Sequence, residues 1–386
     1  MPVEPLAPFR APRSAYIHVP FCRHRCGYCD FTLVAGRDDL IERYLSAMER
    51  ELATLETPRS VDTLFLGGGT PTHLAPGQLE RFLKLLRTWF DLAHDAEFSV
   101  EANPRDLLES DRVNVLARLG VNRISLGVQS FDDAVLLRLE RDHRAEEVER
   151  VVEHLSCSIP NVALDLIFGV PGQTLESWRK TLDRAIALRP AHVSTYGLTF
   201  EKGTTFWTRR SKGELSPAPE DLEYEMYALA MDQLPAAGFG QYELSNFARP
   251  ARECRHNETY WAGHPCFAFG PGAARYIAGV REIGHRSTTS WLAKVEAGES
   301  PIGYREELTA EDRAREALIV GLRRNRGVSR DEFARDHGFS LDELGGPAWD
   351  RLCQRGLIAA TEDGYRLTRA GRFLADTVTV EFVGTT

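Results

Sequence analysis

The sequence lacks any run of 18 or more apolar residues, the length from which a stretch reads as a transmembrane helix. Its first fifteen residues contain four prolines and no apolar core typical of a leader peptide, so we expect no secretory signal. The 47 Lys and Arg residues are outnumbered by 56 Asp and Glu residues, which gives a net charge of −9. The chain therefore lacks the overall basic field that attracts nucleic acid or anionic lipid, and we expect neither as a partner.

Cysteine is scarce and unevenly placed. Of seven cysteines, Cys22, Cys26 and Cys29 are crowded into one loop, and four others are scattered along the chain. Seven cysteines in this arrangement do not suit a disulfide framework. They are typical of a protein in the reducing cytoplasm, where we expect this protein to be found. With 43% hydrophobic and 27% charged residues, the composition is that of an ordinary globular protein.

What the sequence does contain is a series of short apolar segments that predict buried parallel strands. The predicted strands end in Gly, Pro or a polar residue and cover 14–20, 61–69, 97–104, 123–130, 161–172 and 192–200. Helical patterns, such as those over 38–55 and 78–90, lie between them. Alternating strands and helices favour an α/β fold, here an open or partial (βα)6 barrel. In such barrels the carboxyl ends of the strands form one mouth, where we expect the chemistry.

The rest of the chain divides by its character. We expect a tail over 1–13, the barrel over 14–205, and a less regular extension over 206–307 that contains the motif "HNETYW". Residues 308–386 predict a mostly helical, winged-helix-like domain in which Ser329 caps a helix. From 310 onward 12 basic side chains face 13 acidic ones, which argues against DNA binding and favours a structural or lid role.

The cysteines follow the first strand in the spacing C-x3-C-x2-C, in "CRHRCGYC". A structural zinc site would need a further ligand, either His24 or one of the distant Cys254, His256, His264 and Cys266, and this alternative stays open. An electron-carrying cluster uses four cysteines. Three thiolates instead suit a [4Fe–4S] cluster whose fourth iron binds a small chelating molecule. The amine and carboxylate of S-adenosylmethionine would fit that vacancy.

An ordered set of motifs resembles a known family. The set is "YIHVPFCRHRCGYCDF", "GGGTPT", "EANP", "GVQSF", "DLIFGVPGQT" and "HNETYW". The three-cysteine motif resembles the radical SAM superfamily. The whole set, from about residue 14 to the C-terminus, is similar to the oxygen-independent coproporphyrinogen III oxidases and their relatives. This resemblance implies a radical SAM barrel in which Cys22, Cys26 and Cys29 hold the cluster.

The resemblance also implies the residues that bind S-adenosylmethionine. They come from the mouth of the barrel and number nine in this sequence: Tyr16, Gly68, Gly69, Thr70, Glu101, Gln129, Arg141, Asp165 and Gly197. The sequence departs from the family in one place, because Glu140 precedes Arg141 where many relatives have glycine. We expect the arginine to keep its contact, with a local backbone difference.

The family contains both oxidases and heme chaperones, and two features favour the chaperones. The oxidases carry a further cysteine after the third and a longer N-terminal arm, whereas this chain has Asp30-Phe31 and about thirteen residues before the first strand. The chaperones share an H-N-x-x-Y-W motif, which implies heme binding by His256. Cys254, His264 and Cys266 remain alternative or second ligands. We therefore expect a heme chaperone that delivers heme to apo-proteins such as respiratory enzymes.

Other possibilities remain open at this point. Coproporphyrinogen III oxidation, or radical chemistry on another substrate, would use the same cluster. Homodimerisation is also left open.

Overall fold

The computed structural model describes residues 9–383, so part of the expected tail 1–13 lies outside the described residues. The centre of the fold is a curved sheet of nine strands in the order β11-β1-β4-β5-β6-β7-β8-β10-β9. Its six central strands are all parallel: β1 (Ser14–Val19), β4 (Arg59–Gly68), β5 (Phe90–Ala102), β6 (Arg123–Gln129), β7 (Asn161–Phe168) and β8 (His192–Gly197). They fall on the six predicted segments, and the α/β fold is confirmed.

Three short strands extend this sheet at its two edges. β11 (Phe267–Phe269) pairs in parallel with β1, while β10 (Asn246–Ala248) pairs antiparallel with both β8 and β9 (Gly240–Gln241). All three lie in the region that we expected to be less regular. The sheet stays open, as predicted for a partial barrel.

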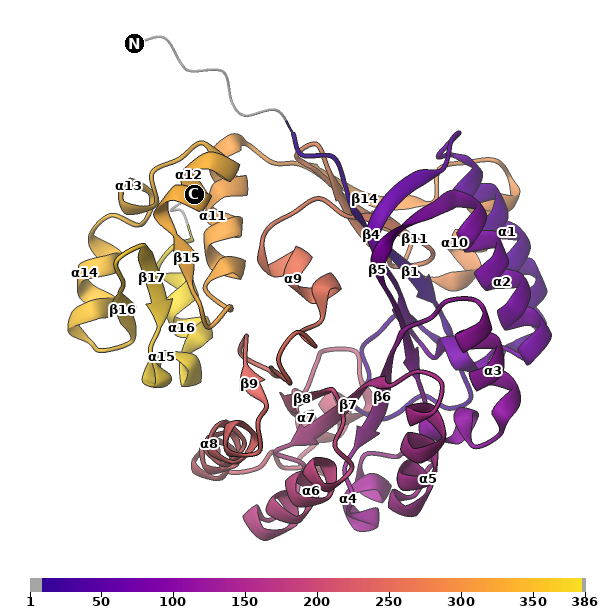
Figure 1. Cartoon of the computed structure of the whole chain (residues 1–386), viewed down its shortest axis with the longest axis horizontal. Coiled ribbons are helices and arrows are strands. Elements are labelled where there is room, and N and C mark those ends of the chain that lie inside the picture. The colour runs from indigo at the N-terminus through magenta and orange to yellow at the C-terminus, as the bar shows by residue number, and fades with distance from the viewer. Residues whose placement is uncertain (1–8, 384–386) are drawn as a thin grey trace.

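Helices cover the outer face of the curved sheet (Figure 1). They are α1 (Ile41–Ala53), α2 (Pro76–Trp89), α3 (Ser110–Arg118), α4 (Asp133–Arg138), α5 (Ala145–Ser156), α6 (Leu175–Ala187) and α8 (Glu220–Ala236). The predicted spacing is visible in α1, which buries Tyr44, Leu45, Met48 and Leu52 against the sheet. The single-turn helices η1 (Asp38–Leu40), η2 (Pro71–His73) and η3 (Pro104–Leu107) lie in connections between these elements.

The opposite, inner face of the sheet is covered in part by α9 (Arg255–Trp261), the helix that carries the "HNETYW" motif (Figure 1). Residues 206–307 also contain most of α7 (Thr205–Ser211), α10 (Thr288–Glu296) and a three-stranded antiparallel meander. The meander consists of β12 (Ala274–Ile277), β13 (Val280–Gly284) and β14 (Ile302–Glu307). The extension is therefore more regular than its sequence suggests.

The C-terminal segment forms a second lobe on the other side of α9 (Figure 1). Its helices are α11 (Ala310–Gly321), α12 (Arg330–His337), α13 (Leu341–Gly345), α14 (Pro347–Gln354), α15 (Arg369–Phe373) and α16 (Ala375–Val380). A small sheet of β15 (Val328–Ser329), β17 (Gly364–Leu367) and β16 (Ile358–Ala360) forms the wing. The Ser329 side chain accepts a hydrogen bond from the backbone N–H of Glu332, as predicted for a cap.

No helix within residues 9–383 is long and apolar enough to span a bilayer.

Candidate functional site

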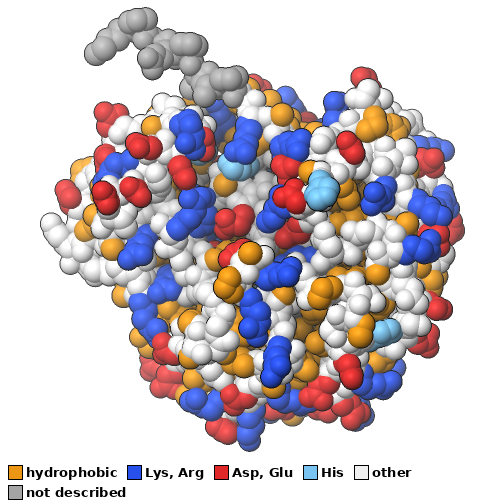
Figure 2. Space-filling view, viewed as in Figure 1, with side chains coloured by type: hydrophobic (Ala, Val, Ile, Leu, Met, Phe, Trp, Pro, Cys, Tyr) orange, Lys and Arg blue, Asp and Glu red, His pale blue; other side chains and the backbone are white. Residues whose placement is uncertain are grey.

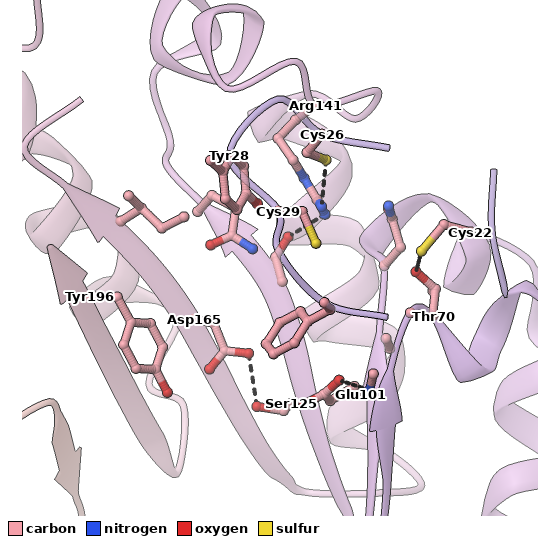
Figure 3. A pocket seen from close by; sticks show the side chains of 18 of the residues that line it. Cys22, Cys26, Tyr28, Cys29, Thr70, Glu101, Ser125, Arg141, Asp165 and Tyr196 are labelled. Atoms are coloured by element: carbon pink, nitrogen blue, oxygen red, sulfur yellow. Dashed lines mark hydrogen bonds between the residues drawn. The ribbon is translucent and has the colours of Figure 1, made fainter. Parts of the chain in front are cut away.

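A cavity of about 500 Å³ opens at the carboxyl ends of the central strands. The cysteine loop lies over one side of it, and side chains from β4 to β8 line the other sides (Figure 3). It brings together eleven of the thirteen residues that the sequence singled out. They are Cys22, Cys26, Cys29, Gly68, Gly69, Thr70, Glu101, Gln129, Arg141, Asp165 and Gly197. The expected mouth is therefore a real cavity in the fold.

The cysteine loop is closed at its base by two short strands, β2 (Phe21–Cys22) and β3 (Val34–Ala35), which pair in parallel. All three cysteines are free thiols, and no group of three His, Cys, Asp or Glu side chains in 9–383 is placed to hold a single metal ion. Burial raises the pKa of Cys22 to about 12 and that of Cys29 to about 11. A bound metal cluster would favour the thiolate forms, so the donor set fits an iron–sulfur cluster.

Side chains from outside the cysteine loop contact the thiols of Cys22 and Cys26. The Thr70 hydroxyl lies 3.3 Å from Cys22 Sγ, and Arg141 Nη1 donates to Cys26 Sγ over 3.7 Å (Figure 3). A second nitrogen of the same guanidinium, Nη2, donates to the Gly127 carbonyl at 2.8 Å. Arg141 thus ties the cysteine loop to β6.

The glycine-rich end of β4 is shaped by close contacts. Gly68 has a φ of +107°, which favours glycine, and its N–H donates to Glu101 Oε2 at 2.9 Å. A Cβ on Gly67 would lie 2.8 Å from the Glu101 carboxyl group. A side chain on Gly67 would push the carboxylate away, whereas one on Gly68 would collide with the His18 ring. The two glycines therefore allow Glu101 and His18 to approach this end of β4.

Two buried carboxyl groups face the cavity from β5 and β7. Burial raises the pKa of Glu101 to about 7, against the effect of the Gly68 N–H, and Asp165 raises it further. Asp165 accepts hydrogen bonds from the hydroxyls of Ser125 at 2.9 Å and Ser194 at 2.8 Å, and burial raises its pKa as well. Such groups can accept hydrogen bonds from an amine or from ribose hydroxyls.

The departure at Glu140 has a visible backbone consequence. Glu140 adopts a φ of +58°, in the left-handed region that glycine occupies without strain. Its carboxylate pairs with Arg209 at 2.9 Å. A glutamate thus adopts a backbone conformation that favours glycine, and Arg141 lines the cavity. The contact of Arg141 with S-adenosylmethionine stays a prediction.

Two predicted residues do not line the cavity. Tyr16 stacks on Phe65, with ring centroids 6.1 Å apart, and its hydroxyl lies 3.0 Å from His18 Nδ1. Phe65 does line the cavity. A direct contact of Tyr16 with S-adenosylmethionine stays a prediction, and this structure places Tyr16 behind the cavity wall.

His256 is the second of these residues and is 1% exposed. Its Nδ1 lies 2.8 Å from the Thr63 hydroxyl, and its Nε2 lies 2.9 Å from the Tyr260 hydroxyl. Its ring stacks on Phe65 at 5.0 Å. Burial lowers its pKa to about 3, so the imidazole is neutral. Both ring nitrogens are thus occupied within the protein, and in this conformation neither is open to an iron atom.

The motif helix is fixed to the sheet at its first turn. The Glu97 carboxylate on β5 accepts hydrogen bonds from the backbone N–H groups of Arg255, at 3.0 Å, and His256, at 3.1 Å. A carboxylate at this end of a helix satisfies otherwise unpaired donors. This contact positions α9, so that Cys254 and Asn257 line the cavity.

Sequence reasoning missed several other residues that line the cavity. Tyr28 lies in the cysteine loop beside Arg141, whereas Ser125 and Tyr196 come from the sheet (Figure 3). Arg123 on β6 and Ser194 on β8 line the cavity as well. The signal that points to the strand residues is their spacing, because every second side chain of a strand faces the same side.

The comparisons with known proteins agree with this geometry. A model of the radical SAM superfamily matches residues 16–185, and a model of the HemN C-terminal domain matches 308–374. The chain is 37% identical over 377 residues to the heme chaperone HemW of Bacillus subtilis, covering 96% of this chain and 99% of that one. It is 32% identical over 373 residues to the heme chaperone HemW of Escherichia coli, covering 95% and 97%. The solved structure of coproporphyrinogen III oxidase HemN from Escherichia coli matches with a TM-score of 0.84 and 26% identity, covering 96% and 90%.

The barrel, the three-cysteine loop and the family model define a radical SAM protein, which implies a [4Fe–4S] cluster and S-adenosylmethionine. The near-complete alignments go further: the chain belongs to the HemW family within the group related to coproporphyrinogen III oxidases. The resemblance recognised in the motifs is confirmed.

Proposed function

We propose that this protein is a heme carrier that delivers heme to apo-proteins such as respiratory enzymes. The observation that carries the proposal is the alignment, over nearly the whole of both chains, with relatives named as heme chaperones. The cysteine loop agrees with it, because Asp30 and Phe31 stand where an oxidase of the wider family would have a further cysteine.

The cysteine cavity offers donor groups for the cluster and for S-adenosylmethionine. Cys22, Cys26 and Cys29 would hold three irons, and the backbone of Gly68 and Gly69 with Thr70 would receive the amino group of S-adenosylmethionine. The other polar groups would bind the remainder of the molecule, and these are Glu101, Gln129, Arg141, Asp165 and Gly197. When bound, the cluster supplies an electron that can break the S–C5′ bond of S-adenosylmethionine.

The residues of this chain would orient that ligand. Arg141 can pair with a carboxylate while it remains anchored to Gly127, since a guanidinium presents five donors. Asp165, whose oxygens already accept from two serine hydroxyls, can still accept from ribose hydroxyls through its remaining lone pairs.

For heme itself we propose His256 as an axial ligand. A neutral imidazole is the form that binds iron, and burial keeps this ring neutral. Because both nitrogens are hydrogen-bonded, one bond, to Thr63 or to Tyr260, must open before iron can bind. Heme binding is therefore coupled to a movement of α9 or of the ring.

The test is a heme titration of the anaerobically reconstituted protein, followed by absorbance. We expect wild type to bind heme with a shifted Soret band and His256→Ala to lose that band. Reconstitution without iron and sulfide shows whether the cluster contributes. If the wild-type protein binds no heme under these conditions, the proposed function is wrong.

Coproporphyrinogen III oxidation is the second candidate, because the oxidase HemN shares the fold over most of both chains. Formation of protoporphyrinogen from coproporphyrinogen, coupled to release of methionine, would establish it. Cleavage of S-adenosylmethionine with neither activity would point to another radical SAM substrate.

A further inference from the structure

A second pocket, of about 280 Å³, lies between the barrel and the C-terminal lobe. Its walls come from the chain that leads into β1, from α9, and from the turn between α11 and β15. Figure 2 shows Lys and Arg side chains and a histidine gathered on the visible face along the seam between the two lobes. No function described so far uses this pocket, which we call the arginine pocket.

The arginine pocket is rich in positive charge. Its lining includes only two acidic side chains, Asp62 and Glu258, against five arginines, which are Arg10, Arg13, Arg255, Arg324 and Arg326. Three of the five have carboxylate partners. Arg13 pairs with Asp62 at 2.6 Å, Arg255 with Asp95 at 3.4 Å and Arg326 with Glu332 at 3.0 Å.

The other two arginines have no carboxylate partner within 4 Å among residues 9–383. Arg10 Nη1 lies 2.9 Å from His264 Nε2, and Arg324 donates to the Gly321 carbonyl at 3.4 Å. Arg324 is 7% exposed. Burial and the nearby Arg326 lower its pKa, while Glu258 opposes this. Glu258, Glu332 and Asp336 act on this guanidinium only from beyond 4 Å. An almost buried guanidinium with no carboxylate in direct contact is unfavourable, and a bound anion would relieve it.

The arginine pocket reaches the partner of the motif histidine. Thr63 lines the pocket, and its hydroxyl is the group that lies 2.8 Å from His256 Nδ1. Thr259, which also lines the pocket, lies on α9 and shares a hydrogen bond of 2.9 Å with Ser14. An anion held by Arg10 and Arg324 would thus lie on the His256 side of the barrel, across α9 from the cysteine cavity.

We infer that the arginine pocket binds carboxylate groups, and that in this protein these are the propionates of heme. The second half of the inference rests on the proposed function. Heme carries two propionates, and guanidinium groups bind carboxylates through paired, charge-assisted hydrogen bonds. The propionates would enter this pocket of about 280 Å³, and the macrocycle would lie outside it.

The experiment compares hemin with hemin dimethyl ester, which has the same ring and no propionate charge. Both are titrated into the reconstituted full-length protein as wild type, as Arg10→Gln/Arg324→Gln, and as Arg150→Gln/Arg179→Gln. The last double variant is a matched control, because Arg150 on α5 and Arg179 on α6 are exposed arginines outside the pocket. A thermal melt of each variant checks folding.

We expect the pocket variant to bind hemin about tenfold more weakly than wild type, or weaker still, with the affinity for the dimethyl ester unchanged. The control variant should behave as wild type with both ligands. Unchanged hemin affinity in the pocket variant overturns the inference, and so does an equal loss for hemin and ester. If wild type binds neither ligand, the proposed function itself fails, which is a distinct outcome.

Discussion

The two hydrogen bonds of His256 lead to a prediction about heme affinity. If iron binds one ring nitrogen, the hydroxyl that now occupies that nitrogen competes with iron, and removing the hydroxyl removes the competitor. Thr63→Val and Tyr260→Phe each delete one of the two hydroxyls and keep the shape of the side chain. Since an imidazole gives iron one nitrogen at a time, we expect one of the two variants, and not both, to bind heme more tightly.

The magnitude follows from the burial of the ring. His256 is 1% exposed, so a nitrogen without its partner cannot turn to water. An unsatisfied buried polar group costs about 1–3 kcal/mol, and each 1.4 kcal/mol is about tenfold in affinity. The heme-free form of the relevant variant is destabilised by that amount, while the heme-bound form, which lacks this bond already, is not. Heme affinity should therefore rise by about 5-fold to about 140-fold.

The assay is a heme titration of wild type and both variants, together with urea unfolding of each protein without heme. The gain in heme affinity should equal the loss in unfolding free energy for the variant at the ligating nitrogen. The other variant should lose stability with no gain in affinity. If both variants lose stability and neither binds heme more tightly, while His256→Ala abolishes binding, competition at the ring is refuted.

Three further predictions concern Glu51, Glu97 and Cys26. Burial raises the pKa of Glu51 from 4.5 to about 7, so the folded state holds this proton more tightly, and stability is lost as pH rises from about 4.5 to 7. This loss is about 3 kcal/mol; Glu51→Gln should flatten the urea-unfolding profile between pH 5 and 8, leaving the smaller slope that the similarly raised Glu101 contributes. Glu97→Gln removes the charge that caps α9 and should lower the unfolding free energy by about 1–3 kcal/mol. Relative to wild type, amide exchange should become faster in α9 and stay the same in α1. Cys26→Ala should lose most of the iron and sulfide measured after reconstitution, whereas Cys157→Ala, at an exposed position, should keep both.

The central fold could be predicted because its signals are local. Each predicted parallel strand is a short apolar segment, and the structure changes mainly the ends. β5 begins at Phe90 rather than at residue 97, and β7 ends at Phe168 rather than at residue 172. The regular elements of 206–307 were missed for physical reasons. β11 has three residues and is defined only by its pairing with β1, and α8 contains Pro235 and no clear apolar stripe.

Some residues of the candidate site could also be predicted from the sequence, whereas others could not. Residues at strand ends could be placed at one mouth because parallel strands end at one edge of the sheet. The hydrogen bonding of His256 could not be predicted, since its partner Thr63 is 193 positions away, on strand β4. The arginine pocket has no local signal either, because it joins Arg10, ahead of β1, to Arg324, between α11 and β15.

These observations give α9 a place between two cavities. Cys254 and Asn257 at its start face the cysteine cavity, whereas Glu258 and Thr259 face the arginine pocket, and His256 lies against the sheet between them. A ligand that draws His256 away from the sheet must strain the hydrogen bonds by which Glu97 holds the first turn of this helix. The same movement would shift Asn257 at the wall of the cysteine cavity. Since one seven-residue helix carries both walls, heme on one side and the cluster with S-adenosylmethionine on the other should influence each other through α9.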